Sequence, residues 1–124
     1  MTFRLGPVNV ICTSLERSLA FYRDVLGFEL AERGEGFARL QCADRALYLL
    51  EAEGAEPQST PYCRVATFSL DLEVEDIEAA FAHFQSCGAR FARELEPGGG
   101  NFFVMDPDGL VLEVVRNKGE ATHT

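Results

Sequence analysis

The sequence contains no tryptophan and only two histidines, His83 and His123, among its 124 residues. It has no uninterrupted apolar stretch long enough to span a membrane. Residues 1–7 lack the hydrophobic core of a secretion signal, so we expect a cytoplasmic protein that does not bind membranes. The four cysteines are scattered without a Cys-x-x-Cys pair, which predicts free thiols in a reducing compartment.

Positive charge is also scarce. Eleven Lys and Arg residues stand against 20 Asp and Glu residues, which gives a formal net charge of −9 and a pI near 4.6. Nucleic-acid binding needs a basic surface, so this composition excludes it. The acidic balance favours a cationic ligand by long-range attraction, although it would equally keep an ordinary protein soluble. A hydrophobic content of 47 % is enough for one domain with a proper core.

The most informative stretch is residues 101–115, where two apolar runs flank an Asp-Pro-Asp-Gly segment. Proline and glycine between two such runs predict a β-hairpin. In its second strand, Leu112 and Val114 should share one face and Glu113 should lie on the other. Glu113 is then a carboxylate within an apolar strand, which requires water, a partner, a metal or a ligand.

The rest of the chain is predicted to repeat one pattern. One helix should begin after Ser14 or Thr13 and end at Gly27, and a second should begin after Asp76 and end at Gly88. The predicted strands are residues 8–12, 28–33, 37–42, 46–51, 65–74 and 91–95, together with the hairpin. These elements form two βαβββ modules, 5–52 and 62–117, joined by a polar linker, 53–61. We predict one α+β domain, 1–118, with a tail at 119–124.

Two segments carry a family resemblance: Ser-Leu-Glu-Arg-Ser-Leu-Ala-Phe-Tyr-Arg-Asp-Val-Leu-Gly-Phe at 14–28, and Asp-Pro-Asp-Gly-Leu-Val-Leu-Glu at 106–113. They resemble the vicinal oxygen chelate superfamily, also called the glyoxalase/bleomycin-resistance/dioxygenase family, over roughly residues 5–117. The resemblance implies a curved mixed sheet around a U-shaped groove. It also implies a homodimer in which the groove is completed between subunits.

Metal-using members of that family hold a divalent ion with four ligands, usually His and Glu. Carried over by position, the ligand sites fall at Pro7, Leu49, Ser69 and Glu113. Proline and leucine cannot ligate a metal, and serine is a poor ligand for these ions. A shift in register supplies no histidine from a strand. We therefore predict no metal and no other cofactor.

If the carried-over sites face the groove, residues two positions away on each strand face it too. The predicted ligand-binding residues are Asn9, Ile11, Leu47, Leu49, Thr67, Ser69, Phe103, Val111 and Glu113, with Glu51, Asp71 and Met105 as further candidates. The opposite faces should pack under the helices. They include Val10 and Cys12, Tyr48 and Leu50, Phe68 and Leu70, and Leu112 and Val114.

We predict a metal-independent small-molecule-binding protein that sequesters an antibiotic or another cationic ligand in the groove. Drug-binding members of the family tend to stack tryptophan on their ligands, so Phe103, Phe102 or Tyr62 would take that role here. The alternative is a lyase, isomerase or dioxygenase with Glu113 as general base or residual metal ligand. A third possibility is a regulatory protein whose groove holds a peptide of a partner.

Overall fold

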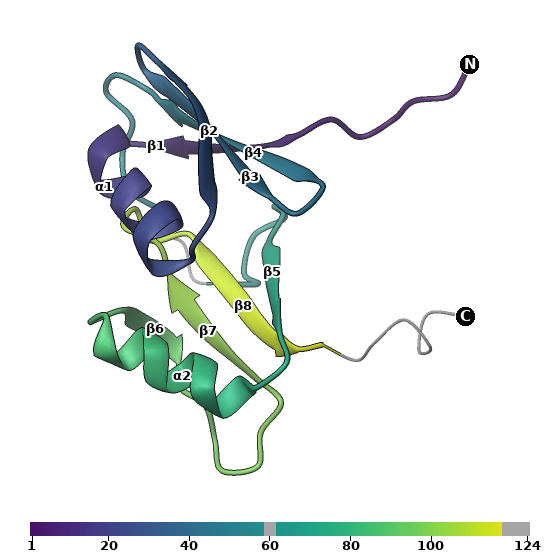
Figure 1. Ribbon diagram of the computed structural model, residues 1–124, viewed down its shortest axis with the longest axis vertical. Coiled ribbons are helices and arrows are strands. Elements are labelled where there is room, and N and C mark those ends of the chain that lie inside the picture. The colour runs from purple at the N-terminus through teal and green to yellow at the C-terminus, as the bar shows by residue number, and fades with distance from the viewer. Residues whose placement is uncertain (59–61, 118–124) are drawn as a thin grey trace. The chain divides into compact units, whose positions relative to one another are not determined.

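The computed structural model describes residues 1–58 and 62–117 (Figure 1). The predicted tail with His123 and residues 59–61 of the predicted linker lie outside the described residues. Contacts divide the chain into two compact units, Met1–Pro57 and Gln58–Thr124. None of the helices in the described ranges is long and apolar enough to cross a bilayer.

The first unit consists of β1 (Val8–Cys12), α1 (Leu15–Leu19), η1 (Ala20–Val25), β2 (Glu29–Gly34), β3 (Phe37–Cys42) and β4 (Arg45–Glu51). The second consists of β5 (Leu70–Val74), α2 (Ile77–Ser86), β6 (Arg90–Arg93), β7 (Asn101–Met105) and β8 (Val111–Arg116). The sheet orders are β1-β4-β3-β2 and β5-β8-β7-β6, and in each the first pair is parallel. This equivalence confirms the two predicted βαβββ modules.

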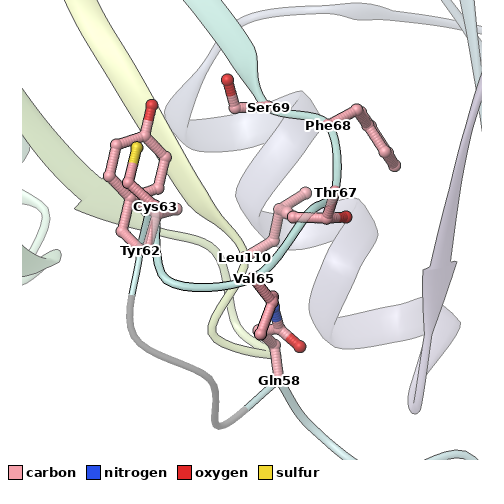
Figure 2. Close-up of a pocket in the computed structure, with 9 residues that line it drawn as sticks. Gln58, Tyr62, Cys63, Val65, Thr67, Phe68, Ser69 and Leu110 are labelled. Carbon is pink, nitrogen blue, oxygen red and sulfur yellow. The ribbon is translucent and has the colours of Figure 1, made fainter.

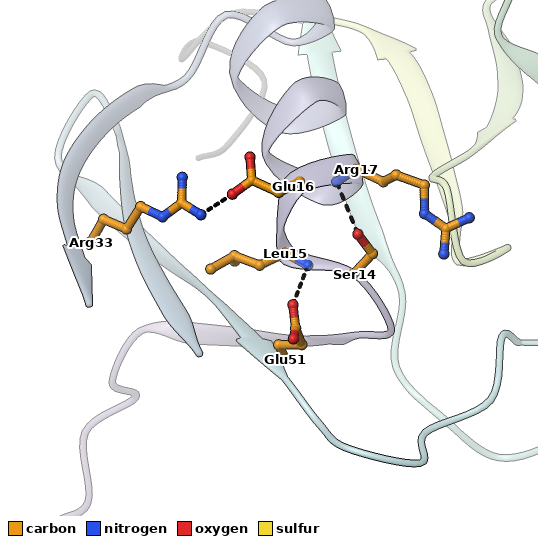
Figure 3. A network of polar contacts seen from close by, with 6 residues as sticks. All are labelled: Ser14, Leu15, Glu16, Arg17, Arg33 and Glu51. Atoms are coloured by element: carbon orange, nitrogen blue, oxygen red, sulfur yellow. Dashed lines mark hydrogen bonds and ion pairs between the residues drawn. The ribbon is translucent and has the colours of Figure 1, made fainter. Parts of the chain in front are cut away.

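The first helix begins where the sequence predicts. Ser14 accepts a hydrogen bond from the Arg17 backbone N–H at 3.3 Å, and the Glu51 carboxylate accepts one from the Leu15 N–H at 2.7 Å (Figure 3). Both bonds satisfy helix N–H groups that have no partner within the helix. The segment was predicted as one helix, but after Leu19 it continues as the π-helical η1. Glu51, predicted as a groove candidate, is thus an anchor for α1.

The hairpin between β7 and β8 also forms as predicted. The Asp106 side chain accepts hydrogen bonds from the backbone N–H groups of Asp108 and Leu110, both at 2.9 Å. Gly109 adopts φ +88°, which favours glycine. The backbone N–H of Gln58 donates to the Asp108 carbonyl at 2.6 Å, so the start of the second unit is bonded to the turn.

The core of the second unit lies between α2 and one face of its sheet. Phe102, Leu112 and Val114 are 0 % exposed, and the rings of Phe81 and Phe84 pack against Phe102 with centroids 5.3 and 5.8 Å apart. The predicted alternation in the hairpin strands is therefore confirmed. It leaves Glu113 and Phe103 on the opposite face, which carries the candidate site.

One predicted strand is shorter than expected. β5 begins at Leu70 rather than at residue 65, and Val65 and Phe68 are 52 % and 55 % exposed. The prediction that Phe68 packs under a helix was wrong. The physical reason is that the parallel partner strand, β8, begins at Val111 directly after the hairpin turn. Since Leu70 pairs with Leu112, the residues before Ser69 lie beyond the start of that strand.

Candidate functional site

Four side chains form a row across the sheet of the second unit. Arg93 on β6 pairs with Phe103 on β7, Phe103 pairs with Glu113 on β8, and Glu113 pairs with Asp71 on β5. Paired residues point to the same face of a sheet. Phe103 and Glu113 are half-buried, while Arg93 and Asp71 are exposed. We call these four residues the transverse row.

Asn101 connects two members of the transverse row, Arg93 and Glu113. Its side-chain amide donates a hydrogen bond to Glu113 Oε2 at 2.8 Å, and its side-chain oxygen accepts one from Arg93. Arg93 also donates to the Asn101 carbonyl at 3.3 Å, and its guanidinium carbon lies 5.0 Å from the centroid of the Phe103 ring. The guanidinium is therefore held by a cation–π contact and by hydrogen bonds at once.

Negative charge gathers at the other end. The pKa of the Asp71 carboxyl is raised above its ordinary value, first by partial burial and then by the negative charges of Glu113 and Glu73. A raised pKa means that the surroundings of Asp71 disfavour its ionised form. A bound cation would relieve that repulsion.

A hollow of about 130 Å³ is formed by the segment that precedes β5 and by the start of β8 (Figure 2). Its lining residues are Gln58, Tyr62, Cys63, Val65, Thr67, Phe68, Ser69, Leu110 and Val111. The Tyr62 ring lies 5.0 Å from the Phe103 ring, measured between centroids. This contact joins the hollow to the transverse row.

The predicted site residues of the second unit are thus found together. Thr67, Ser69 and Val111 line the hollow, although the first two come from a loop rather than from a strand. Phe103 and Glu113 belong to the transverse row. Whether any of them binds a ligand stays a prediction.

In the first unit the predicted face assignment was wrong for one strand. Val8 pairs with Leu47 and Val10 with Leu49, so both leucines share the face of Val10, and Leu49 is 0 % exposed. Asn9 and Ile11 are exposed on the other face, which the half-buried Tyr48 shares. The prediction placed β4 one residue out of register. The pair Asp71–Glu113 of the second unit corresponds to the pair Asn9–Tyr48 of the first, so Tyr48 rather than Leu49 is the equivalent of Glu113.

This correction changes the carried-over metal positions. They become Pro7, Tyr48, Ser69 and Glu113, still without histidine. Among residues 1–58 and 62–117, no group of three or more His, Cys, Asp and Glu side chains could hold a metal ion.

The sequence prediction missed Arg93 and Asn101. Both lie at strand positions whose importance depends on partners far along the chain, namely Phe103 and Glu113. An arginine at the end of a short strand has no local signal that distinguishes it from a surface residue.

The fold is of the α+β class, with one βαβββ module in each of the two units. The model of the Glyoxalase/Bleomycin resistance protein/Dioxygenase superfamily matches residues 4–114. The chain belongs to this superfamily.

Three similar proteins illustrate its range. A bleomycin resistance protein of Geobacillus stearothermophilus is 33 % identical over 79 % of this chain and 85 % of its own. The glutathione transferase FosA of Serratia marcescens is 26 % identical over 89 % of this chain and 78 % of its own. The crystal structure of a glyoxalase family protein from Enterococcus faecalis superposes with a TM-score of 0.73 at 23 % identity, covering 90 % and 96 % of the two chains. The last likeness concerns the fold alone.

Proposed function

We propose that this protein binds a cationic organic small molecule without a metal and sequesters it. The binding surface in this proposal is the face of the second unit that carries Asp71, Phe103 and Glu113. The observation that carries the proposal is the position of two neighbouring carboxylates. Asp71 pairs with Glu113, and Glu113 pairs with the half-buried Phe103 beside the hollow.

The aromatic part would supply contact area. Phe103 and Tyr62 have ring centroids 5.0 Å apart with their planes tilted by 48°. Aromatic faces attract cations and flat apolar groups, and they lose little conformational entropy when a ligand binds. Phe103 and Tyr62 would thus replace the absent tryptophan.

The carboxylates would supply the charge preference. Glu113 is held by Asn101 at 2.8 Å, which fixes its orientation before any ligand arrives. Asp71 lies beside it and has a raised pKa that reflects partial burial and two like charges. A cation placed between them gains from both, and the net charge of −9 adds long-range attraction.

One comparison supports an antibiotic as the kind of organic ligand. The relative from Geobacillus stearothermophilus is named as a bleomycin resistance protein and is 33 % identical.

We further propose that the two units pack as one domain, that the protein is a cytoplasmic homodimer, and that it needs no cofactor.

A thermal-unfolding screen tests this proposal. Chelator-treated protein would be heated with cationic antibiotics and, separately, with divalent iron, manganese, nickel and zinc. A specific ligand at about 100 times its Kd should add about 2.7 kcal/mol of stability, which raises the midpoint by several degrees.

Variants make the test specific. Glu113→Gln should weaken binding of the organic cation about tenfold because one charged partner is lost. Glu96→Gln makes the same change in charge on the loop before β7 and should bind like the wild type. A stabilising metal whose effect disappears in Glu113→Gln would contradict the metal-free proposal.

One observation favours an enzyme as the second candidate. Asp71 and Glu113 are adjacent carboxyls, and one of them has a raised pKa, an arrangement that can provide an acid and a base. The similarity to the glutathione transferase FosA agrees with this. A lyase, isomerase or dioxygenase activity that follows one carboxylate in its pH–rate profile, and is lost in folded Glu113→Gln, would favour the enzyme.

A further inference from the structure

The transverse row has opposite charges at its two ends. Arg93 lies on one edge strand, β6, and Asp71 lies on the other, β5, with Phe103 and Glu113 between them. Neighbouring strands are about 4.8 Å apart, so the backbone positions of Arg93 and Glu113 are separated by roughly 10 Å and those of Arg93 and Asp71 by roughly 14 Å.

These charges do not neutralise one another. The ion pairs within residues 1–58 and 62–117 are Glu16–Arg33, Glu32–Arg39 and Glu78–Arg116, and none of them includes a member of the row. Arg93 contacts a neutral ring and a neutral amide, and Glu113 contacts the same amide. The row therefore presents one cation and two carboxyls to a ligand.

Asn101 keeps the two charges apart. Its side chain receives a hydrogen bond from Arg93 and donates one to Glu113, so it lies between them and prevents a direct ion pair. The spacing of the charges is set by the strands and by this amide rather than by flexible side chains alone. Such preorganisation lowers the entropy cost of binding a ligand of matching length.

We propose that the natural ligand is dipolar: an elongated small molecule with a cationic group at Asp71 and Glu113 and a carboxylate at Arg93. Its apolar middle lies along Phe103 and Tyr62. Arg93 is the residue that distinguishes this ligand from a simple cation. The inference rests on the proposed function and adds to it the second charge and the length of the ligand.

Three probes of one skeleton test the second charge. 4-(4-Aminobutyl)benzoate carries both charges about as far apart as the backbone positions of Arg93 and Glu113. Its methyl ester is only a cation, and its N-acetyl derivative is only an anion. Titration of each into isotope-labelled protein, followed by amide NMR shifts, gives the Kd and shows which residues respond.

The full-length wild type should bind the zwitterion about fivefold more tightly than the ester, the range of an exposed ion pair. This preference should vanish in Arg93→Gln and persist in Arg93→Lys. Arg23→Gln, on an exposed position of η1, is the matched control and should keep it. The ester should still bind to Arg93→Gln, and the amide spectrum of this variant without ligand should show that it is folded.

Each alternative result has a definite meaning. If the ester binds and the zwitterion binds no more tightly, or if the preference survives in Arg93→Gln, the dipolar ligand is ruled out and the cation-binding function stands. If the N-acetyl anion binds as well as the zwitterion, or if neither cationic probe binds, both proposals are overturned.

Discussion

Replacement of Gly109 by alanine tests how the hairpin turn holds the segment that lines the hollow. Gly109 has φ +88°, and an added Cβ would lie 2.5 Å from the carbonyl oxygen of Gln58. The left-handed conformation costs an alanine about 1–2 kcal/mol. Gln58 cannot retreat freely because its N–H donates to the Asp108 carbonyl at 2.6 Å, and loss of that bond costs about 1 kcal/mol more.

The two costs can be separated with other glycines of the same unit. Gly98 has φ +73° with nothing within 4 Å of an added Cβ, so Gly98→Ala reports the backbone cost alone. Gly100 has open space and no positive φ, so Gly100→Ala should change the free energy of unfolding by less than about 1 kcal/mol. In Gly109→Ala the free energy of unfolding should fall by about 2–3 kcal/mol in total.

Urea denaturation followed by circular dichroism gives these free energies. Gly109→Ala should also weaken binding of the organic cation, because Gln58 and Val111 line the hollow on either side of the turn. Equal losses in Gly109→Ala and Gly98→Ala would refute the role of the Gln58 contact.

Two further predictions concern carboxylates. Glu51→Ala should lower the free energy of unfolding by about 1 kcal/mol because the Leu15 N–H loses its acceptor, whereas Glu53→Ala should have little effect in the same urea assay. The raised pKa of Asp71 means that the folded state holds this proton more tightly than the unfolded state, so its contribution to stability is lost as pH rises through that pKa. Asp71→Asn should remove this decline in urea titrations between about pH 3 and pH 7, and an unchanged decline would contradict it.

Local patterns predicted most of the elements correctly. Side chains that cap helices act within a few residues, so Ser14 and Asp76 marked both helix starts. The Asp-Pro-Asp-Gly turn is equally local, since Asp106 bonds to backbone groups two and four residues ahead. Repetition of these signals then predicted the two modules.

Pairing between strands was less predictable. Alternation along a strand divides its residues into two faces but does not say which face meets the helix. For β4 the choice made from the repeat was wrong by one residue, which exchanged Leu49 and Tyr48. For β5 the alternation continued past the end of the partner strand, so Phe68 was expected in the core and is exposed.

The sequence by itself determined the two modules, the hairpin and the unusual position of Glu113, because each depends on neighbours close along the chain. Only the tertiary structure decided that Arg93, Phe103, Glu113 and Asp71 form one row, and that Asn101 lies between its charges. These residues come from four strands. The local hairpin turn sets the pairing of Phe103 with Glu113, but Arg93 and Asp71 align with them through hydrogen-bond register between strands that no tight turn joins.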